Sequence, residues 1–190
     1  MGNSAPQTDA RSLREELVGL DVVHQHIAAY QWAINNGRAI DVFGEFAKER
    51  NLRVFQSGNE CENWIDTILN VVYKMNTLVH TGDNILRLLD RIEWYNTLFP
   101  TTALHFVGIQ IMSSTHVYPV FSQPFVSSCR LATEQEITEY MQSRGFIPQN
   151  LDGVFANQEY LLSDIKPKNV LIAPNGTIFV IDAEIERLNQ

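Results

Sequence analysis

The feature that most constrains this chain is the string at residues 164–184, which reads DIKPKNVLIAPNGTIFVIDAE. Two apolar runs rich in β-branched residues, 170–173 and 177–181, flank Asn175-Gly176. Asn-Gly between such runs is the strongest short-range signal of a β-hairpin. The string therefore predicts an antiparallel hairpin with polar residues before its first strand and after its second.

The predicted turn also sets which residues face one another. If Asn-Gly forms the whole loop, Pro174 pairs with Thr177, and counting along the strands places Asn169 opposite Asp182. Directly opposed residues share a face, with Cβ atoms about 5 Å apart. We therefore expect an amide oxygen and a carboxylate to reach one divalent cation. Hard oxygen ligands of this kind suit Mg²⁺ bound to the phosphates of a nucleotide.

Asp164 precedes the hairpin, where its carboxylate could accept a proton from an attacking hydroxyl. The alternative for the whole segment is a surface hairpin with polar ends, which is common, and Asn-Gly alone does not separate the two. The full pattern of D-x-K-P-x-N, a hairpin and then I-D is much more specific. It favours a catalytic site.

The segment resembles the catalytic loop and metal-binding hairpin of the protein-kinase-like superfamily, in which H-R-D-x-x-x-x-N precedes D-F-G. In this chain L-S replaces H-R before Asp164, and D-A-E beginning at Asp182 takes the place of D-F-G. The resemblance implies Asp164 as catalytic base. It implies Lys166 as a second catalytic residue near the transferred phosphoryl group, and Asn169 and Asp182 as metal ligands.

Three further stretches narrow the resemblance: RIEWYNTLFP at residues 91–100, VYPVFSQPFV at 117–126 and EITEYMQSRGF at 136–146. With the hairpin, they look like the small kinase domain of bacterial polyvalent proteins, which phages and conjugative elements encode. The resemblance covers roughly residues 52–184. It implies ATP and Mg²⁺ as cofactors and a hydroxyl of a protein or small molecule as acceptor.

The fold expected from these patterns is an α+β, truncated two-lobed protein-kinase-like fold with a helical N-terminal extension. We expect a disordered tail at residues 1–10 and the helical extension at 11–51. A minimal kinase-like domain follows at 52–190, with an N-lobe at about 52–122 and a C-lobe at about 126–190. The N-terminal helices would either pack on the kinase-like body or form the surface for a partner protein or a second copy of the chain.

The expected N-lobe contains candidates for phosphate binding. The string V-V-Y-K ending at Lys74 resembles the V-A-I-K strand, whose lysine binds the α- and β-phosphates, although a lysine at a strand end is also common without function. Gly58 is the only glycine between Gly44 and Gly82, so it belongs either to a reduced phosphate-binding turn or to an ordinary one. We expect residues 60–67 to form a tight loop.

A helix is predicted at residues 83–99, capped by Asp83 and ended by Pro100. Its place after the lysine strand is that of the kinase helix whose carboxylate pairs with the strand lysine. Glu93 is the first candidate for that carboxylate and Asp90 the second. An ordinary solvated acidic residue is the alternative for both.

Two strands are predicted at residues 104–110 and 117–121, followed by a linker at 122–125. In kinases the polar edge of adenine bonds to backbone groups of this linker. The resemblance therefore assigns Gln123 and Phe125 to nucleotide binding through their backbone.

Two capping boxes predict where helices begin. One runs from Ser12 to Glu15, and the other from Thr133 to Glu136. The second helix should stop at Gly145, since glycine is favoured just past the end of a helix.

Composition excludes several classes of function. Fourteen basic residues against 22 acidic ones give a net charge of −8, which argues against broad binding of nucleic acid backbones. No apolar run is long enough to span a bilayer and no secretory signal is evident, so we expect no membrane association and a cytoplasmic location. Cys61 and Cys129 form no metal-binding pattern and are expected to be reduced structural thiols.

The main expectation is ATP- and Mg-dependent transfer of the γ-phosphoryl group to a hydroxyl. One alternative is a catalytically weak pseudokinase that acts as a nucleotide-binding or protein-interaction module, and the poor glycine loop favours it. The other is a structural protein whose hairpin matches by accident. Walker A, G-x-S-x-G, H-E-x-x-H and paired C-x-x-C motifs are absent, so no competing chemistry is as clearly indicated.

Overall fold

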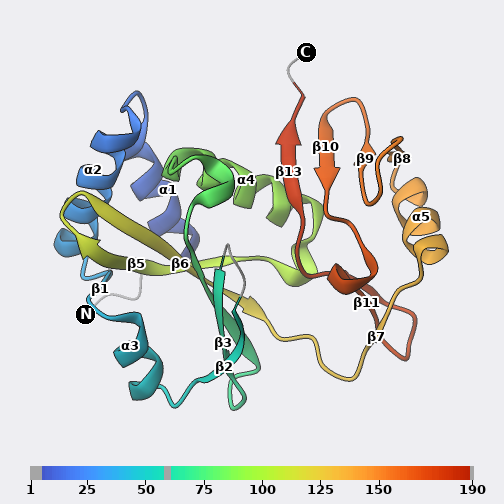
Figure 1. Ribbon diagram of the computed structural model, residues 1–190, viewed down its shortest axis with the longest axis horizontal. Helices are drawn as coiled ribbons and strands as arrows, with labels where there is room; N and C mark the ends of the chain where they lie inside the picture. Colours follow the sequence, from blue (N-terminus) through green and yellow to red (C-terminus); the bar gives the residue numbers. More distant parts are fainter. Residues whose placement is uncertain (1–5, 58–60, 189–190) are drawn as a thin grey trace. The chain divides into compact units, whose positions relative to one another are not determined.

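The computed structural model describes residues 6–57 and 61–188, shown in Figure 1. These residues form helices and mixed sheets, which confirms the predicted α+β fold. Their contacts divide into two units. Unit 1 holds the residues up to Ile92 and Leu104–Phe125, and unit 2 holds Glu93–Ala103 and the chain from Val126 onward.

Unit 1 is built on a sheet whose described strands have the order β1-β5-β6-β4-β3-β2. β1 runs parallel to β5, and the other neighbours are antiparallel. The strands are β1 (Ala39–Ile40), β2 (Arg53–Ser57), β3 (Cys61–Asp66), β4 (Val71–Asn76), β5 (His105–Ser113) and β6 (His116–Pro124).

β3 lies where the sequence predicts a tight loop, so that prediction is wrong. β3 pairs with β4 along its whole length and with β2 on its other side, and this pairing overrides the weak local preference of its residues. The turn between β3 and β4 is held by Asp66, whose Oδ1 accepts the backbone N–H groups of Ile68 and Leu69 at 2.9 and 2.8 Å. These two apolar residues are exposed in the turn.

Helices cover both faces of this sheet. α1 (Pro6–Leu17) and α2 (Val22–Asn35) lie against β5 and β6, as Figure 1 shows, and Leu13 and Trp32 pack there with Phe106 and Phe121. On the other face, α3 (Phe43–Glu49) packs its aromatic side chains against β3, β4 and β6. The helices of the expected extension therefore contribute to the core of unit 1.

Two predicted helix starts need correction. α1 begins at Pro6, so residues 6–10 are helical rather than part of a tail, and Ser12 lies inside the helix, where its Oγ accepts a hydrogen bond from Trp32 Nε1 at 3.2 Å. Residues 1–5 lie outside the described part. α4 (Ile85–Leu98) is capped by Asn84, whose Oδ1 accepts the Arg87 N–H at 2.8 Å, and not by Asp83.

Unit 2 consists of small antiparallel sheets, the last residues of α4 and helix α5 (Glu134–Ser143). α5 begins with the predicted capping box, in which Thr133 and Glu136 bond each other's backbone N–H groups. The strands are β7 (Arg130–Leu131), β8 (Ile147–Pro148), β9 (Phe155–Ala156), β10 (Tyr160–Ser163), β11 (Val170–Ile172), β12 (Ile178–Val180) and β13 (Glu184–Arg187). No described helix of either unit is long and apolar enough to cross a bilayer.

Candidate functional site

Two strand pairs of unit 2 converge on the segment that carries the predicted catalytic residues. β10 is antiparallel to β13, with Ser163 opposite Glu184, and β11 is antiparallel to β12. Asp164 directly follows β10, and Asn169 directly precedes β11. Asp182 lies in the short connection from β12 to β13, so the backbones of all three predicted residues meet where the two strand pairs join.

The hairpin itself is confirmed, but its loop is longer than predicted. Ala173 N–H donates to Thr177 O at 2.9 Å, and Gly176 N–H donates to Ala173 O at 2.9 Å. Residues 174–176 therefore form a three-residue loop. Gly176 has a φ of +84°, the left-handed conformation that ends a type I turn in loops of this length.

This additional loop residue shifts the predicted register by one position. Val170 pairs with Val180, and Ile181 N–H donates to Asn169 O at 2.9 Å. Asn169 is thus opposite Ile181, and the predicted pairing of Asn169 with Asp182 is wrong. Because a shift of one residue changes the face of every side chain in a strand, strand pairing gives no reason for Asn169 and Asp182 to share a face.

Asp164 is fixed instead by Asn169 through side-chain hydrogen bonds. Asp164 has a φ of +56°, which is uncommon for a non-glycine residue. Asn169 Nδ2 donates to the Asp164 carbonyl oxygen at 2.9 Å and to Asp164 Oδ2 at 2.8 Å. Since the Asn169 amide nitrogen makes both bonds, its Oδ1 is the atom suited to bind a cation. Asn169 is buried, so this orientation is well defined.

Two lysines lie beside the Asp164 carboxylate. Lys168 Nζ is 3.0 Å from Asp164 Oδ2, and Lys166 Nζ is 3.9 Å from Asp164 Oδ1 and 3.6 Å from Asp152 Oδ2. The Lys166 side chain passes over Gly153, where an added Cβ would come within 2.7 Å of Lys166 Cγ. Gly153 therefore leaves the space that lets Lys166 reach Asp164.

Asn169 and Asp182 supply oxygen donors of the kind that Mg²⁺ bound to a nucleotide requires. Among the described residues, no group of three or more His, Cys, Asp or Glu side chains could hold a metal by itself. Magnesium bound to a nucleotide needs only one or two protein ligands, because phosphate oxygens and water complete its shell. Asn169 Oδ1 and the exposed Asp182 carboxylate fit this requirement in type and number.

A buried polar cluster holds the strand that leads to Asp182. Tyr95 and Thr102 both donate to the Val180 carbonyl oxygen, each at 2.6 Å, and their hydroxyl oxygens are 3.0 Å apart. Both side chains are buried within unit 2. The backbone two residues before Asp182 is therefore fixed by the end of α4 and the turn that follows it.

The residues predicted to bind the nucleotide are distributed over unit 1. Lys74 lies within β4, opposite Phe121 of β6 and Asn63 of β3. Gln123 belongs to β6 rather than to a linker. Phe125 N–H donates to Asn70 O at 2.8 Å and is thus already used within the unit. Gly58 lies outside the described residues.

The two acidic candidates of α4 differ in their surroundings. Asp90 Oδ1 is 2.5 Å from Arg14 Nη2, so this carboxylate forms an ion pair with α1. Glu93 belongs to unit 2, whereas Lys74 belongs to unit 1. Burial is the main cause that raises the pKa of Tyr160, and Glu159 is the next. The negative charge of Glu93 makes a smaller contribution in the same direction. Glu93 thus lies within electrostatic reach of β10, and its pairing with Lys74 stays a prediction.

Comparison with known families determines the class of this chain. The family described as Serine/Threonine/Tyrosine Kinase found in polyvalent proteins matches residues 30–189, well over half of the 190. The chain belongs to this kinase family. Its match begins within α2, upstream of the expected boundary at residue 52, which agrees with the packing of α2 in the core of unit 1. No curated protein matches the chain.

The structure of this kinase domain adds residues that the sequence analysis did not single out. Lys168 follows Asp164 by four positions, and the motif pattern treats it as variable. Asp152 and Gly153 come from a different segment, and only the fold brings them to Lys166. The Asp-Gly pair could have indicated a turn, but nothing in the sequence places that turn beside the segment that carries Asp164 and Lys166.

Proposed function

We propose that this chain transfers the γ-phosphoryl group of Mg-bound ATP to a hydroxyl group. The observation that carries the proposal is the Asp164 carboxylate, held by Asn169 and flanked by Lys166 in one short loop. Membership of a kinase family supports phosphoryl transfer in general. The nucleotide, the metal and the acceptor hydroxyl belong to the proposal.

In the proposed reaction, the acceptor hydroxyl donates its proton to Asp164 while its oxygen attacks the γ-phosphorus. The bond between the γ-phosphorus and the bridging oxygen breaks, and ADP leaves. Lys166 would offset the negative charge that develops on the transferred group, and Lys74 would hold the other phosphates.

Asn169 and Asp182 would hold the magnesium, with Asn169 using Oδ1. When bound, Mg²⁺ neutralises phosphate charge and keeps the γ-phosphoryl group in line for attack. The two hydrogen bonds from Asn169 to Asp164 would couple the position of this ligand to that of the base. Tyr95 and Thr102 would keep the segment before Asp182 in place.

The direct test is incubation of the purified chain with γ-labelled ATP, Mg²⁺ and peptides that carry serine, threonine or tyrosine. We expect label on an acceptor peptide or on the chain itself, and loss of labelling when EDTA removes the metal. A thermal-shift measurement in the same buffers reports nucleotide binding separately. Absence of labelling would contradict the proposal, whether or not the nucleotide binds.

One observation favours a second function, a nucleotide-binding module with weak or no transfer. Lys168 Nζ lies 3.0 Å from Asp164 Oδ2, the oxygen that also accepts from Asn169. The Lys168 ammonium group would compete with an acceptor hydroxyl for this carboxylate oxygen. If this pairing suppresses transfer, Lys168→Ala should raise the labelling rate without changing the nucleotide-dependent thermal shift. If the wild type and Lys168→Ala both bind nucleotide but transfer no label, the result would favour a nucleotide-binding module.

A further inference from the structure

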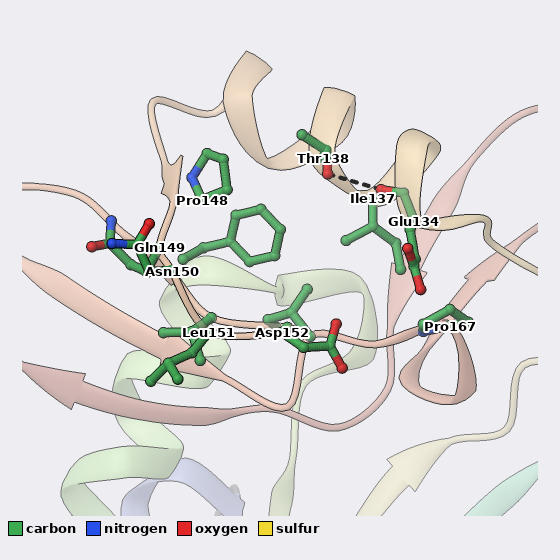
Figure 2. Close-up of a pocket in the computed structure, with 13 residues that line it drawn as sticks. Glu134, Ile137, Thr138, Pro148, Gln149, Asn150, Leu151, Asp152 and Pro167 are labelled. Carbon is green, nitrogen blue, oxygen red and sulfur yellow. Dashed lines mark hydrogen bonds between the residues drawn. The ribbon is translucent and has the colours of Figure 1, made fainter.

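A cavity of about 390 Å³ lies beside the catalytic loop, entirely within unit 2. One wall is α5, with Ile137 and Thr138, and another is the loop between β8 and β9. Ile165 and Pro167, which flank Lys166 in the catalytic loop, complete the lining, as Figure 2 shows in part. This volume lies at the lower end of the range typical of ligand sites.

The walls of this cavity are held by backbone hydrogen bonds. β8 pairs with β9 at Pro148 and Phe155, and Gln149 N–H donates to Val154 O at 2.9 Å. Ile165 N–H donates to Gly153 O at 3.0 Å, which ties the loop between β8 and β9 to the catalytic loop. The cavity therefore keeps a fixed position with respect to Asp164.

One side chain links the cavity to the proposed reaction centre. Asp152 lines the cavity, and its Oδ2 is 3.6 Å from Lys166 Nζ. The same ammonium group is 3.9 Å from Asp164 Oδ1. Only the Lys166 side chain would thus lie between a molecule that contacts Asp152 in the cavity and the Asp164 carboxylate.

The lining has the chemistry to bind a basic, partly apolar group. Its charged residues, Glu134 and Asp152, are both acidic, and no Lys, Arg or His is among the described residues that line it. Ile137, Phe155 and Ile165 form a buried apolar floor of the cavity. In Figure 2 the Glu134 and Asp152 carboxylates both extend toward the side where Pro167 lies. Lysine and arginine side chains combine an apolar stem with a cationic end, which matches this lining.

We propose that this cavity, the acceptor cavity, binds a basic side chain of the protein segment that carries the acceptor hydroxyl. The inference rests on the proposed function, because it gives that reaction a class of substrate. The acceptor would be a segment in which arginine or lysine lies near the phosphorylated residue. The carboxylates of Glu134 and Asp152 would bind the cationic end of the basic side chain, while the apolar floor of the cavity would contact its aliphatic stem.

The test measures binding without ATP, by fluorescence anisotropy at physiological salt with the full chain. Two labelled peptides of equal length each carry one serine, flanked by arginines in one and by glutamines in the other. We expect tighter binding of the arginine peptide. Glu134→Gln should weaken that binding about two- to fivefold, and the double variant with Asp152→Asn about tenfold, with little change for the glutamine peptide.

The matched control is Glu139→Gln, which removes the same charge from an exposed position of α5 outside the cavity lining. It should leave the preference for arginine intact. Equal affinity for the two peptides would overturn the inference, and so would an equal loss in Glu139→Gln, because attraction to the overall negative charge would then explain the binding. An arginine preference that depends on Glu134, in a chain that transfers no label, would support the cavity and contradict only the proposed function.

Discussion

The catalytic loop of unit 2 and the Lys74 strand of unit 1 are held in place by different kinds of interactions. Asn169, Lys166 and Lys168 all contact Asp164 from within the same short stretch of chain. Lys74 is placed by pairing with β3 and β6, which are separate in sequence. Residues fixed by local contacts can be recognised from one string, whereas residues fixed by sheet pairing depend on the whole unit.

The largest effect is expected at Asp164, the proposed catalytic base. Asp164→Asn keeps the shape of the side chain but removes the proton acceptor, so transfer should fall by about 10²–10⁴-fold. Nucleotide binding should change little. Asp41→Asn, which removes one charge from an exposed position of unit 1, is the control for rate measurements with labelled ATP. Equal rates in wild type and Asp164→Asn would show that the base is elsewhere.

Asn169→Ala tests whether local hydrogen bonds hold the loop. The change removes both bonds to Asp164 from a buried position, and we expect a loss of about 1–3 kcal/mol in the free energy of unfolding. The magnesium concentration needed for half-maximal transfer should also rise. Asn35→Ala, at an exposed position of α2, should change neither quantity. Unchanged denaturant unfolding and metal dependence would argue against this role.

Lys74→Met tests the role of β4, where we expect a change in the KM for ATP. Loss of the cation should raise the KM for ATP about tenfold or more, since hydrogen bonds to charged groups contribute about 1.5–3 kcal/mol. Lys48→Met removes a lysine from an exposed position of α3 and serves as control. An unchanged KM in Lys74→Met would argue against a role of Lys74 in phosphate binding.

Tyr95→Phe tests whether buried bonds distant from the loop in sequence support Asp182. The variant loses one of two hydrogen bonds to the Val180 carbonyl, and we expect about 1 kcal/mol of destabilisation. A rise in the metal requirement would identify Tyr95 as a positioning residue. Tyr140→Phe, which removes a hydroxyl bonded to Arg144 on the surface of α5, is the matched control. A metal requirement shifted equally in both variants would contradict the assignment.

The two units should also respond differently to acid. His26 of unit 1 accepts the Val117 N–H through Nδ1 at 3.1 Å and contacts Asp83 O through Nε2 at 2.9 Å, so protonation would remove the acceptor. Burial is the main cause that lowers the pKa of His26 below 6.5. The unfolded chain binds this proton more readily, and the stability of unit 1 should therefore decrease as the pH falls below 6.5.

In unit 2, hydrogen bonds from the Arg130 side chain and from Thr133 lower the pKa of Glu136 from 4.5 to about 2. The stabilisation by Glu136 should therefore persist above pH 4.5 and disappear as the pH falls toward 2. Hydrogen exchange measured residue by residue at several pH values separates the two responses. If α5 lost its protection from hydrogen exchange at the same pH as α2, the expected difference in acid response between the two units would be contradicted.

Much of unit 2 could be predicted because its signals are local. The hairpin and the capping box of α5 are both confirmed from a few neighbouring residues. The register is wrong because a two-residue and a three-residue loop both accommodate Asn-Gly. A two-residue type I′ turn needs a positive φ at both residues, whereas here Gly176 has a positive φ and Asn175 does not. The position of Lys166 against Gly153 could not be predicted, since it depends on a contact between separate segments.

Unit 1 illustrates how non-local pairing limits prediction. The sequence does not predict β3, because pairing with β2 and β4 makes this segment a strand and its own residues do not. The apolar pair Ile68 and Leu69 lies in a turn, because the Asp66 side chain accepts hydrogen bonds from the backbone N–H groups of both residues. The extension helices were predicted as helices, but their burial against β5 and β6 depends on residues far along the chain.

In the proposed function, Asp164, Asn169 and Asp182 would surround a metal–nucleotide site where two strand pairs of unit 2 meet. The most direct measurement replaces Mg²⁺ by paramagnetic Mn²⁺ in the presence of ATP and records the broadening of backbone amide signals by NMR. We predict that the strongest broadening centres on residues 164–169 and 181–183 and disappears in Asp182→Asn. Broadening that is absent with ATP, or centred on another part of the chain, would contradict the account.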